Sequence, residues 1–84
     1  MVVRLHSHAS ARAVERGASE EEIILTVKTG ERFPADFGRI AFRRNFRFDF
    51  IWRGKHYATK QVTAIAAPEP PDGWLVITVI VKYF

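Results

Sequence analysis

The chain has 84 residues, 48% hydrophobic and 26% charged, so it can build one core but no second one, and we expect a single folded domain over residues 1–84. It has no cysteine, which excludes disulfides and thiolate metal sites and favours a cytoplasmic location. We see no signal peptide and no apolar run of the ~20 residues that a membrane helix needs, so we expect no membrane contact.

The formal net charge of +4 is concentrated in the middle of the chain. Residues 37–64 carry seven arginines and lysines but only one acidic residue, Asp49. Such a segment favours binding to a polyanion such as RNA, or to an acidic protein. The alternative is a basic surface that is merely solvated.

Two helices are predicted near the N-terminus, over about residues 4–16 and 19–29. Gly17 suits the left-handed residue that ends a helix. Ser19, with Glu22 three positions later, forms an S-x-x-E capping box, which is typical of a helix start.

After the second helix the apolar pattern changes to a period of two residues, which predicts a sheet over about residues 39–84. The expected fold is α+β, with two N-terminal helices packed on a small antiparallel sheet of three to four strands. The proline-rich segment 68–73 joins the last two strands as a long hairpin. Strands are expected near residues 40–46, 57–66 and 74–83, with a short extension near 48–52.

Aromatic residues occupy even positions between Phe42 and Trp52, whereas most cations there occupy odd positions. Because alternate residues of a strand point to opposite faces, the two sets separate. We expect most of these rings to build the core rather than to stack on bases. Arg44 breaks the pattern, and it marks either a strand end or bulge, or a pocket where charge is needed.

No cofactor or metal ion is expected. The five glycines are scattered, so there is no phosphate-binding loop. His6 and His8 would project about 200° apart on a helix and cannot share a metal there. Since no spacing pairs two carboxylates for acid and base catalysis, the cations and histidines remain, and they suit phosphodiester chemistry.

RNA cleavage without a metal needs a proton acceptor, a proton donor and positive charge at the phosphate. His8, Arg12 and Arg16 are four residues apart and line one flank of the first predicted helix. If this helix packs across the sheet edge, its cations meet those of the strands. Alternatively, Arg12 and Arg16 pair with nearby glutamates, His8 is a surface or capping residue, and the groove is electrostatic without catalysis. The candidate phosphate or RNA contacts are Arg16, Arg43, Arg44 and Lys60.

The motif H-x-x-x-R-x-x-x-R-G followed by S-x-E-E, which begins at His8, and the late V-I-T-V around Thr78 resemble the small bacterial family catalogued as domain of unknown function 4258. The resemblance covers nearly the whole chain. That family is grouped with the RelE-like and barnase-like toxin ribonucleases. The resemblance therefore implies a RelE-like fold, RNA as the target, and a site near His8, Arg12 and Thr78.

Two hypotheses of different classes follow. The first is a RelE-like toxin or toxin-derived, metal-independent ribonuclease with His8 as acid or base. The second is a non-catalytic module whose basic face binds nucleic acid or an acidic, antitoxin-like protein.

Overall fold

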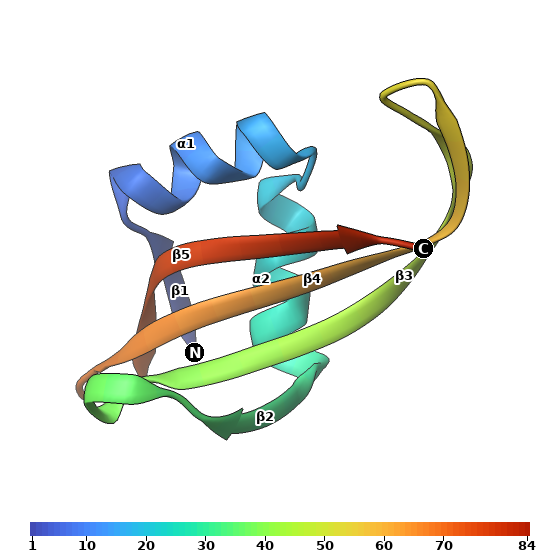
Figure 1. Cartoon of the computed structure of the whole chain (residues 1–84). Helices are drawn as coiled ribbons and strands as arrows, with labels where there is room; N and C mark the ends of the chain where they lie inside the picture. The colour runs from blue at the N-terminus through green and yellow to red at the C-terminus, as the bar shows by residue number, and fades with distance from the viewer.

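The computed structural model describes residues 1–84, which form one five-stranded sheet with two helices on one of its faces (Figure 1). The strand order is β1-β5-β4-β3-β2, and only β1 and β5 run parallel. The elements in chain order are β1 (Val2–Leu5), α1 (Ser7–Arg16), α2 (Glu20–Thr29), β2 (Glu31–Pro34), a 3₁₀ turn (Asp36–Gly38), β3 (Ile40–Trp52), β4 (Lys55–Glu69) and β5 (Gly73–Tyr83).

The α+β class is confirmed, but the expectation of a three- or four-stranded antiparallel sheet is wrong. The two additional strands, β1 and β2, have four residues each, too few to display a clear two-residue period. β1 ends only two residues before α1 begins, so the helix predicted over about residues 4–16 wrongly includes the end of this strand. The side chain of His6 accepts a hydrogen bond from the His8 N–H and starts the helix at Ser7.

The start of α2 is confirmed as a capping box. The Ser19 hydroxyl accepts from the Glu22 N–H at 3.1 Å, and the Glu22 carboxylate accepts from the Ser19 N–H at 2.9 Å. Two of the backbone donors left over at the helix start are thereby satisfied. Three consecutive glutamates in the first turn also favour this end of the helix dipole.

β1 completes the sheet beside the first half of β5, with Val3 opposite Trp74 and Leu5 opposite Val76. Arg4, on the other face of β1, forms two hydrogen bonds with the Glu69 carboxylate, at 3.0 and 2.6 Å. The hydrogen bond from Arg4 lowers the pKa of the Glu69 carboxyl. The pair therefore favours the folded state above the usual carboxyl pKa and stops doing so as the pH falls through the lowered value.

β3 and β4 form a long hairpin whose outer part curls back towards the helices (Figure 1). The pairing shifts between Arg47 and Phe50, where Asp49 has a φ of 47° and marks a bulge. The bulge bends the hairpin so that Trp52, at its tip, stacks on Tyr83 of β5 with ring centroids 4.9 Å apart.

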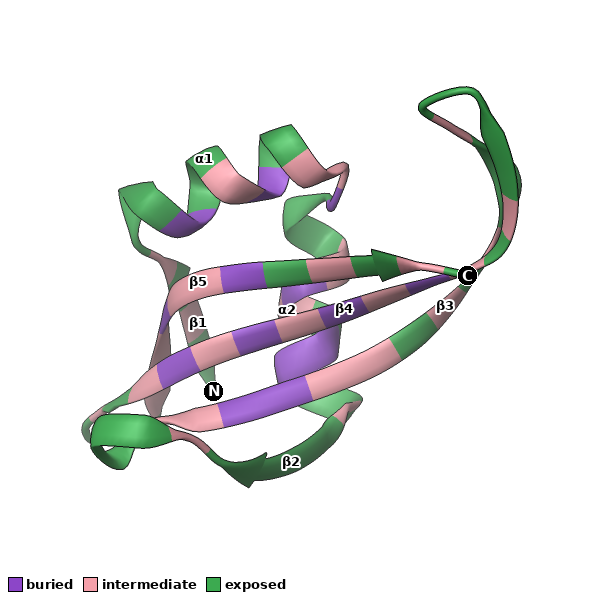
Figure 2. Ribbon diagram, viewed as in Figure 1, coloured by how far each residue is buried: buried purple, intermediate pink, exposed green.

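The core lies between the helices and one face of the sheet, and Figure 2 shows buried segments along the sheet-facing side of α1 and along β4. Ala9 and Ala13 are small enough to bring α1 close to β5. Of the five even-numbered rings, only Phe42 is fully buried, and it packs edge-on against Trp74. Phe50 is 66% exposed, because the hairpin carries it beyond the core. No helix is both long and apolar enough to cross a membrane.

Gly17 ends α1 in the left-handed conformation, with a φ of 79°. A Cβ atom added there would lie 2.6 Å from Tyr83 Oη and 2.7 Å from Trp52 Cζ3. Gly17 thus lets the hairpin tip approach the end of the helix.

We expect Gly17→Ala to lower the free energy of unfolding by about 3 kcal/mol, since it adds a steric clash to backbone strain. Gly38→Ala is the matched control, because Gly38 has a φ of 70° but open space around its Cβ position. That variant should lower the free energy of unfolding by only about 1 kcal/mol. Equal losses for the two variants in urea denaturation would contradict the close approach at Gly17.

Candidate nucleic-acid interface

The flank of α1 that carries His8, Arg12 and Arg16 is largely engaged within the domain. Arg12 donates to the Glu15 carboxylate at 2.8 Å, and Arg16 donates to the backbone oxygen of Val79 at 2.5 Å. His8 is exposed. Arg16 is therefore held inside the domain, whereas Arg12 is in an exposed pair with Glu15.

Thr78 does not share a cleft with His8 and Arg12. The neighbouring Val79 is fully buried in the core beneath the helices. Because successive residues of a strand point to opposite faces, Thr78 lies on the face that the helices do not cover. The sheet separates Thr78 from α1, so the structure does not assemble these three residues into one site.

Lys60 and Arg44 also face the helices. Lys60 is 8% exposed, and its ammonium donates to the backbone oxygen of Gly17 at 2.8 Å and to the Glu22 carboxylate at 3.0 Å. Arg44 donates to the Thr29 hydroxyl at the end of α2. It therefore sits beside a helix end, and both cations are held by internal acceptors.

The last carbonyls of α1 receive hydrogen bonds from three different strands or turns. Arg53 at the hairpin turn donates to Glu15 O at 3.1 Å, Tyr83 of β5 to Arg16 O at 2.7 Å, and Lys60 of β4 to Gly17 O at 2.8 Å. The C-terminal end of a helix carries partial negative charge, which favours cations there. We call these three donors, Arg53, Tyr83 and Lys60, the helix clamp.

Burial raises the pKa of the Tyr83 phenol, the nearby Glu22 carboxylate raises it further, and Arg53 partly opposes both. The neutral hydroxyl that donates to α1 is thus favoured in the folded protein. A phenolate cannot donate this bond.

The uncovered face of the sheet carries a separate set of cations. Strand pairing places three residues of β3, three of β4 and two of β5 in three neighbouring rows, and Phe84, which directly follows β5, completes the third row. Tyr83 packs on the helix side, so Phe84 points to the uncovered face, and the mutual backbone bonds of Phe84 and Thr59 set it in the row of Arg47. We call these nine residues the basic sheet face: Arg43, Asn45, Arg47, Thr59, Gln61, Thr63, Ile80, Lys82 and Phe84.

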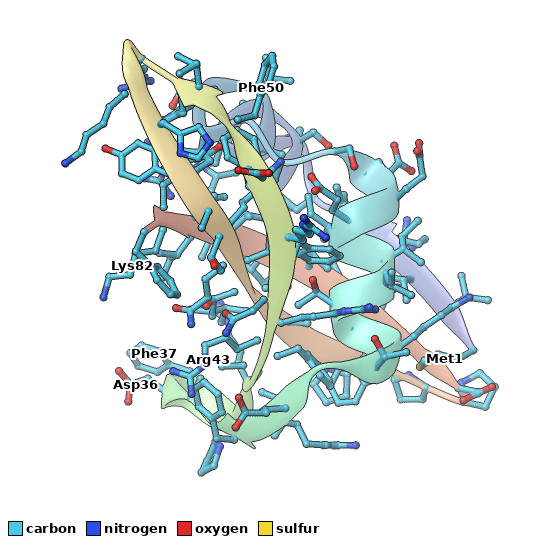
Figure 3. All side chains as sticks on the ribbon, turned by 90° about the vertical axis from the view of Figure 1, so that its right-hand side faces the viewer. Met1, Asp36, Phe37, Arg43, Phe50 and Lys82 are labelled. Atoms are coloured by element: carbon cyan, nitrogen blue, oxygen red, sulfur yellow. The ribbon has the colours of Figure 1, made fainter.

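The nine residues include three cations and no acidic residue, but Glu31 of β2 continues the row of Arg43 and Asp49 lies beside Arg47. Arg47 and Lys82 have no ion-pair or hydrogen-bond partner, whereas Arg43 lies 3.6 Å from the exposed Glu31 carboxylate, a weak surface pair. Figure 3 shows Arg43 and Lys82 on the side of the sheet that faces away from α2. These three side chains are therefore available to an anionic ligand.

Two shallow hollows adjoin on this face. One, of about 380 Å³, is lined by Arg43, Gln61 and Lys82. The other, of about 520 Å³, is lined by Asn45, Arg47 and Thr59 and also by Asp49, whose carboxylate lies 2.8 Å from His56 Nε2. Phe84 lines both hollows and is 54% exposed. No three His, Asp or Glu residues gather to hold a metal ion anywhere in the domain.

The sequence predicts Arg43 as a candidate ligand contact but does not single out Arg47, Lys82 or Phe84, which lie on the same face. Arg47 was already on the odd-numbered, exposed side of β3, so parity was a usable signal for it. Lys82 and Phe84 join this face only through the register of β5 on β4, which period alone does not give.

Comparison of the chain with protein-family models, with curated proteins and with solved structures found no match.

Lys60→Met should lower the free energy of unfolding by about 2 kcal/mol, because it removes two charge-assisted hydrogen bonds and leaves Gly17 O without its donor. Urea denaturation measures this loss. The control is Lys55→Met, which removes an exposed charge from the same strand. A fully stable Lys60→Met protein would show that the helix clamp does not need this ammonium.

Tyr83→Phe should lower the free energy of unfolding by about 1 kcal/mol at pH 7, because it removes the hydrogen bond to Arg16 O. The raised pKa gives a second expectation. In the native protein the stabilising effect of the phenol is fully present below its unfolded value of about 10 and is lost as the pH rises through the higher folded value. Stability should therefore decline less steeply above about pH 10 in Tyr83→Phe than in native protein or in the Tyr57→Phe control. Equal declines in urea titrations would contradict this.

Proposed function

We propose that this domain binds RNA through the basic sheet face and that its primary activity is binding rather than cleavage. The observation that carries the proposal is the set of three cations, Arg43, Arg47 and Lys82, on a sheet face with no covering helix. Two acidic residues, Glu31 and Asp49, border this set, and each has a cationic or histidine partner of its own. A polyanion gains affinity from such a face through release of its counterions.

The chemistry of the face favours nucleic acid over an acidic protein. Protein interfaces usually centre on apolar residues, whereas nucleic-acid interfaces are more polar and more positive. Here the central row consists of Asn45, Gln61 and Lys82, and the only large apolar members are Ile80 and Phe84 at the margin. An antitoxin-like partner would find little apolar surface to bury.

The spacing of the cations suits several phosphates. Arg43 and Arg47 are four residues apart on one strand, so their Cα atoms lie about 13 Å from each other. Lys82 lies two strands away, about 12 Å from each of them at the usual strand separation. Three phosphate contacts on a single strand predict a slope of about −2 for log K against log salt.

The resemblance to domain of unknown function 4258 and to RelE-like ribonucleases supports RNA as the ligand, and two helices on one sheet face are compatible with a RelE-like arrangement. Cleavage is less well supported, because His8 and Arg12 lie on the opposite side of the sheet from Thr78 and from the free cations. The proposed activity needs no catalytic residue.

We expect Arg47→Ala and Lys82→Ala each to weaken RNA binding and to reduce the salt slope by about 0.7. Fluorescence anisotropy with a labelled oligonucleotide at several salt concentrations measures both. Lys28→Ala on α2 is the matched control, since it removes one exposed cation from the other side of the domain. The control should bind like the native protein.

Native protein that binds no RNA at low salt would overturn the proposal, as would equal losses in the control and test variants. Gel analysis of the same RNA checks for cleavage. If the RNA is cut, and if His8→Ala abolishes the cutting in folded protein, the ribonuclease hypothesis replaces a purely binding role.

A further inference from the structure

Phe84 is the one aromatic side chain among the nine residues of the basic sheet face. Its backbone exchanges two hydrogen bonds with Thr59, at 2.8 and 3.0 Å, so the residue continues the pairing of β4 with the end of β5. Its side chain is nevertheless 54% exposed. The sheet therefore presents a ring to solvent from a backbone position that is fixed.

Phe84 lies at a corner of the basic sheet face, in the row of Arg47 and two residues beyond Lys82. It lines the hollow of Arg43 and Lys82 on one side and the hollow of Arg47 on the other. A ligand that fills both hollows contacts Phe84. An apolar, flat group suits the ring, and anionic groups suit Arg43, Lys82 and Arg47.

We propose that Phe84 stacks on an unpaired base of single-stranded RNA, while Arg43 and Lys82 contact backbone phosphate on one side of it and Arg47 on the other. This inference rests on the proposed function and specifies the form of its ligand. Base stacking on an aromatic side chain contributes about 1–3 kcal/mol per base and tolerates any sequence.

The requirement for a single strand follows from the geometry of stacking. In a duplex each base is already stacked on its neighbours and presents only its edges in the grooves. A ring that rises from a sheet can cover the face of a base only if that base is free. Duplex RNA can still place phosphates near the three cations, but it gains nothing from Phe84.

The two amides in the central row supply contacts for a base edge. Gln61 Nε2 donates to Asn45 Oδ1 at 2.9 Å, and this bond leaves the Asn45 amide nitrogen as a donor and the Gln61 oxygen as an acceptor. Because each base edge offers both kinds of group, the pair can accommodate more than one base. We expect weak sequence preference.

The other rings of the hairpin do not serve this purpose. Trp52 is stacked on Tyr83, and Phe48 packs against the same tyrosine at 5.2 Å. Phe50 is 66% exposed, but it pairs with Tyr57, whose ring also lies against Tyr83 on the helix side. Phe50 is thus a comparably exposed ring on the wrong face, which makes it a control.

The test compares Phe84→Ala with native protein on two ligands, a single-stranded oligoribonucleotide that contains 2-aminopurine and the same strand in a duplex. Stacking on the ring should quench the 2-aminopurine fluorescence of the single strand. Phe84→Ala should remove this quenching and weaken single-strand binding about 10-fold. Its duplex affinity and its salt slope should stay unchanged, because its cations are intact.

Phe84→Trp should retain both the quenching and the affinity, whereas Phe84→Leu should behave like Phe84→Ala. Phe50→Ala should bind as native protein does, and circular dichroism confirms that each variant is folded. If Phe84→Ala binds and quenches like native protein while Arg47→Ala and Lys82→Ala are defective, the stacking role is wrong and RNA binding stands. If native protein binds neither ligand, both proposals fail.

Discussion

The fold depends on how the C-terminal end of α1 is held. Three successive carbonyls of this helix, from Glu15 to Gly17, accept hydrogen bonds from Arg53, Tyr83 and Lys60, which come from three places in the sheet. The helix clamp brings the turn of the β3–β4 hairpin, the central strand β4 and the C-terminal strand β5 together at the end of α1. It also brings Gly17 so close to Trp52 and Tyr83 that no side chain fits there. The bent hairpin and the orientation of the helix therefore constrain each other.

The cations of the strands fall into two groups according to the face of the sheet to which they point. Those that face the helices, such as Lys60 and Arg53, neutralise the negative end of a helix and a capping glutamate. Those that face away from the helices, Arg47 and Lys82, have no internal acceptor. The basic segment of this small domain thus stabilises the fold with one group of cations. Only the other group, which faces away from the helices, supplies an electrostatic field for a ligand. The net charge alone does not distinguish them.

The features that could be predicted from the sequence are those that depend only on residues close together in the chain. The capping box at Ser19, the left-handed Gly17 and the period of β3 all follow from neighbouring residues, and the structure contains them. The candidate site required non-local information. The sequence offers Lys60 as a phosphate contact because it is a cation, and nothing local reveals its partner, Gly17 O, which is 43 residues away. The face of Thr78 depends on a register shift opposite Ile65, and such a shift reverses the parity that period-two reasoning assumes.

The pairing of β1 with β5 has a consequence for the order of assembly. Val2 lies opposite Gly73, so this strand pair closes nearly the whole chain into one loop. Contacts between residues so far apart in sequence form late and slow folding, because the entropy of the intervening chain must be lost first. The β3–β4 hairpin and the capped α2 involve only short loops and can form earlier. During synthesis β1 has no strand to pair with until β5 has been made, so the backbone groups that it donates to this pairing stay unpaired until the chain is nearly complete.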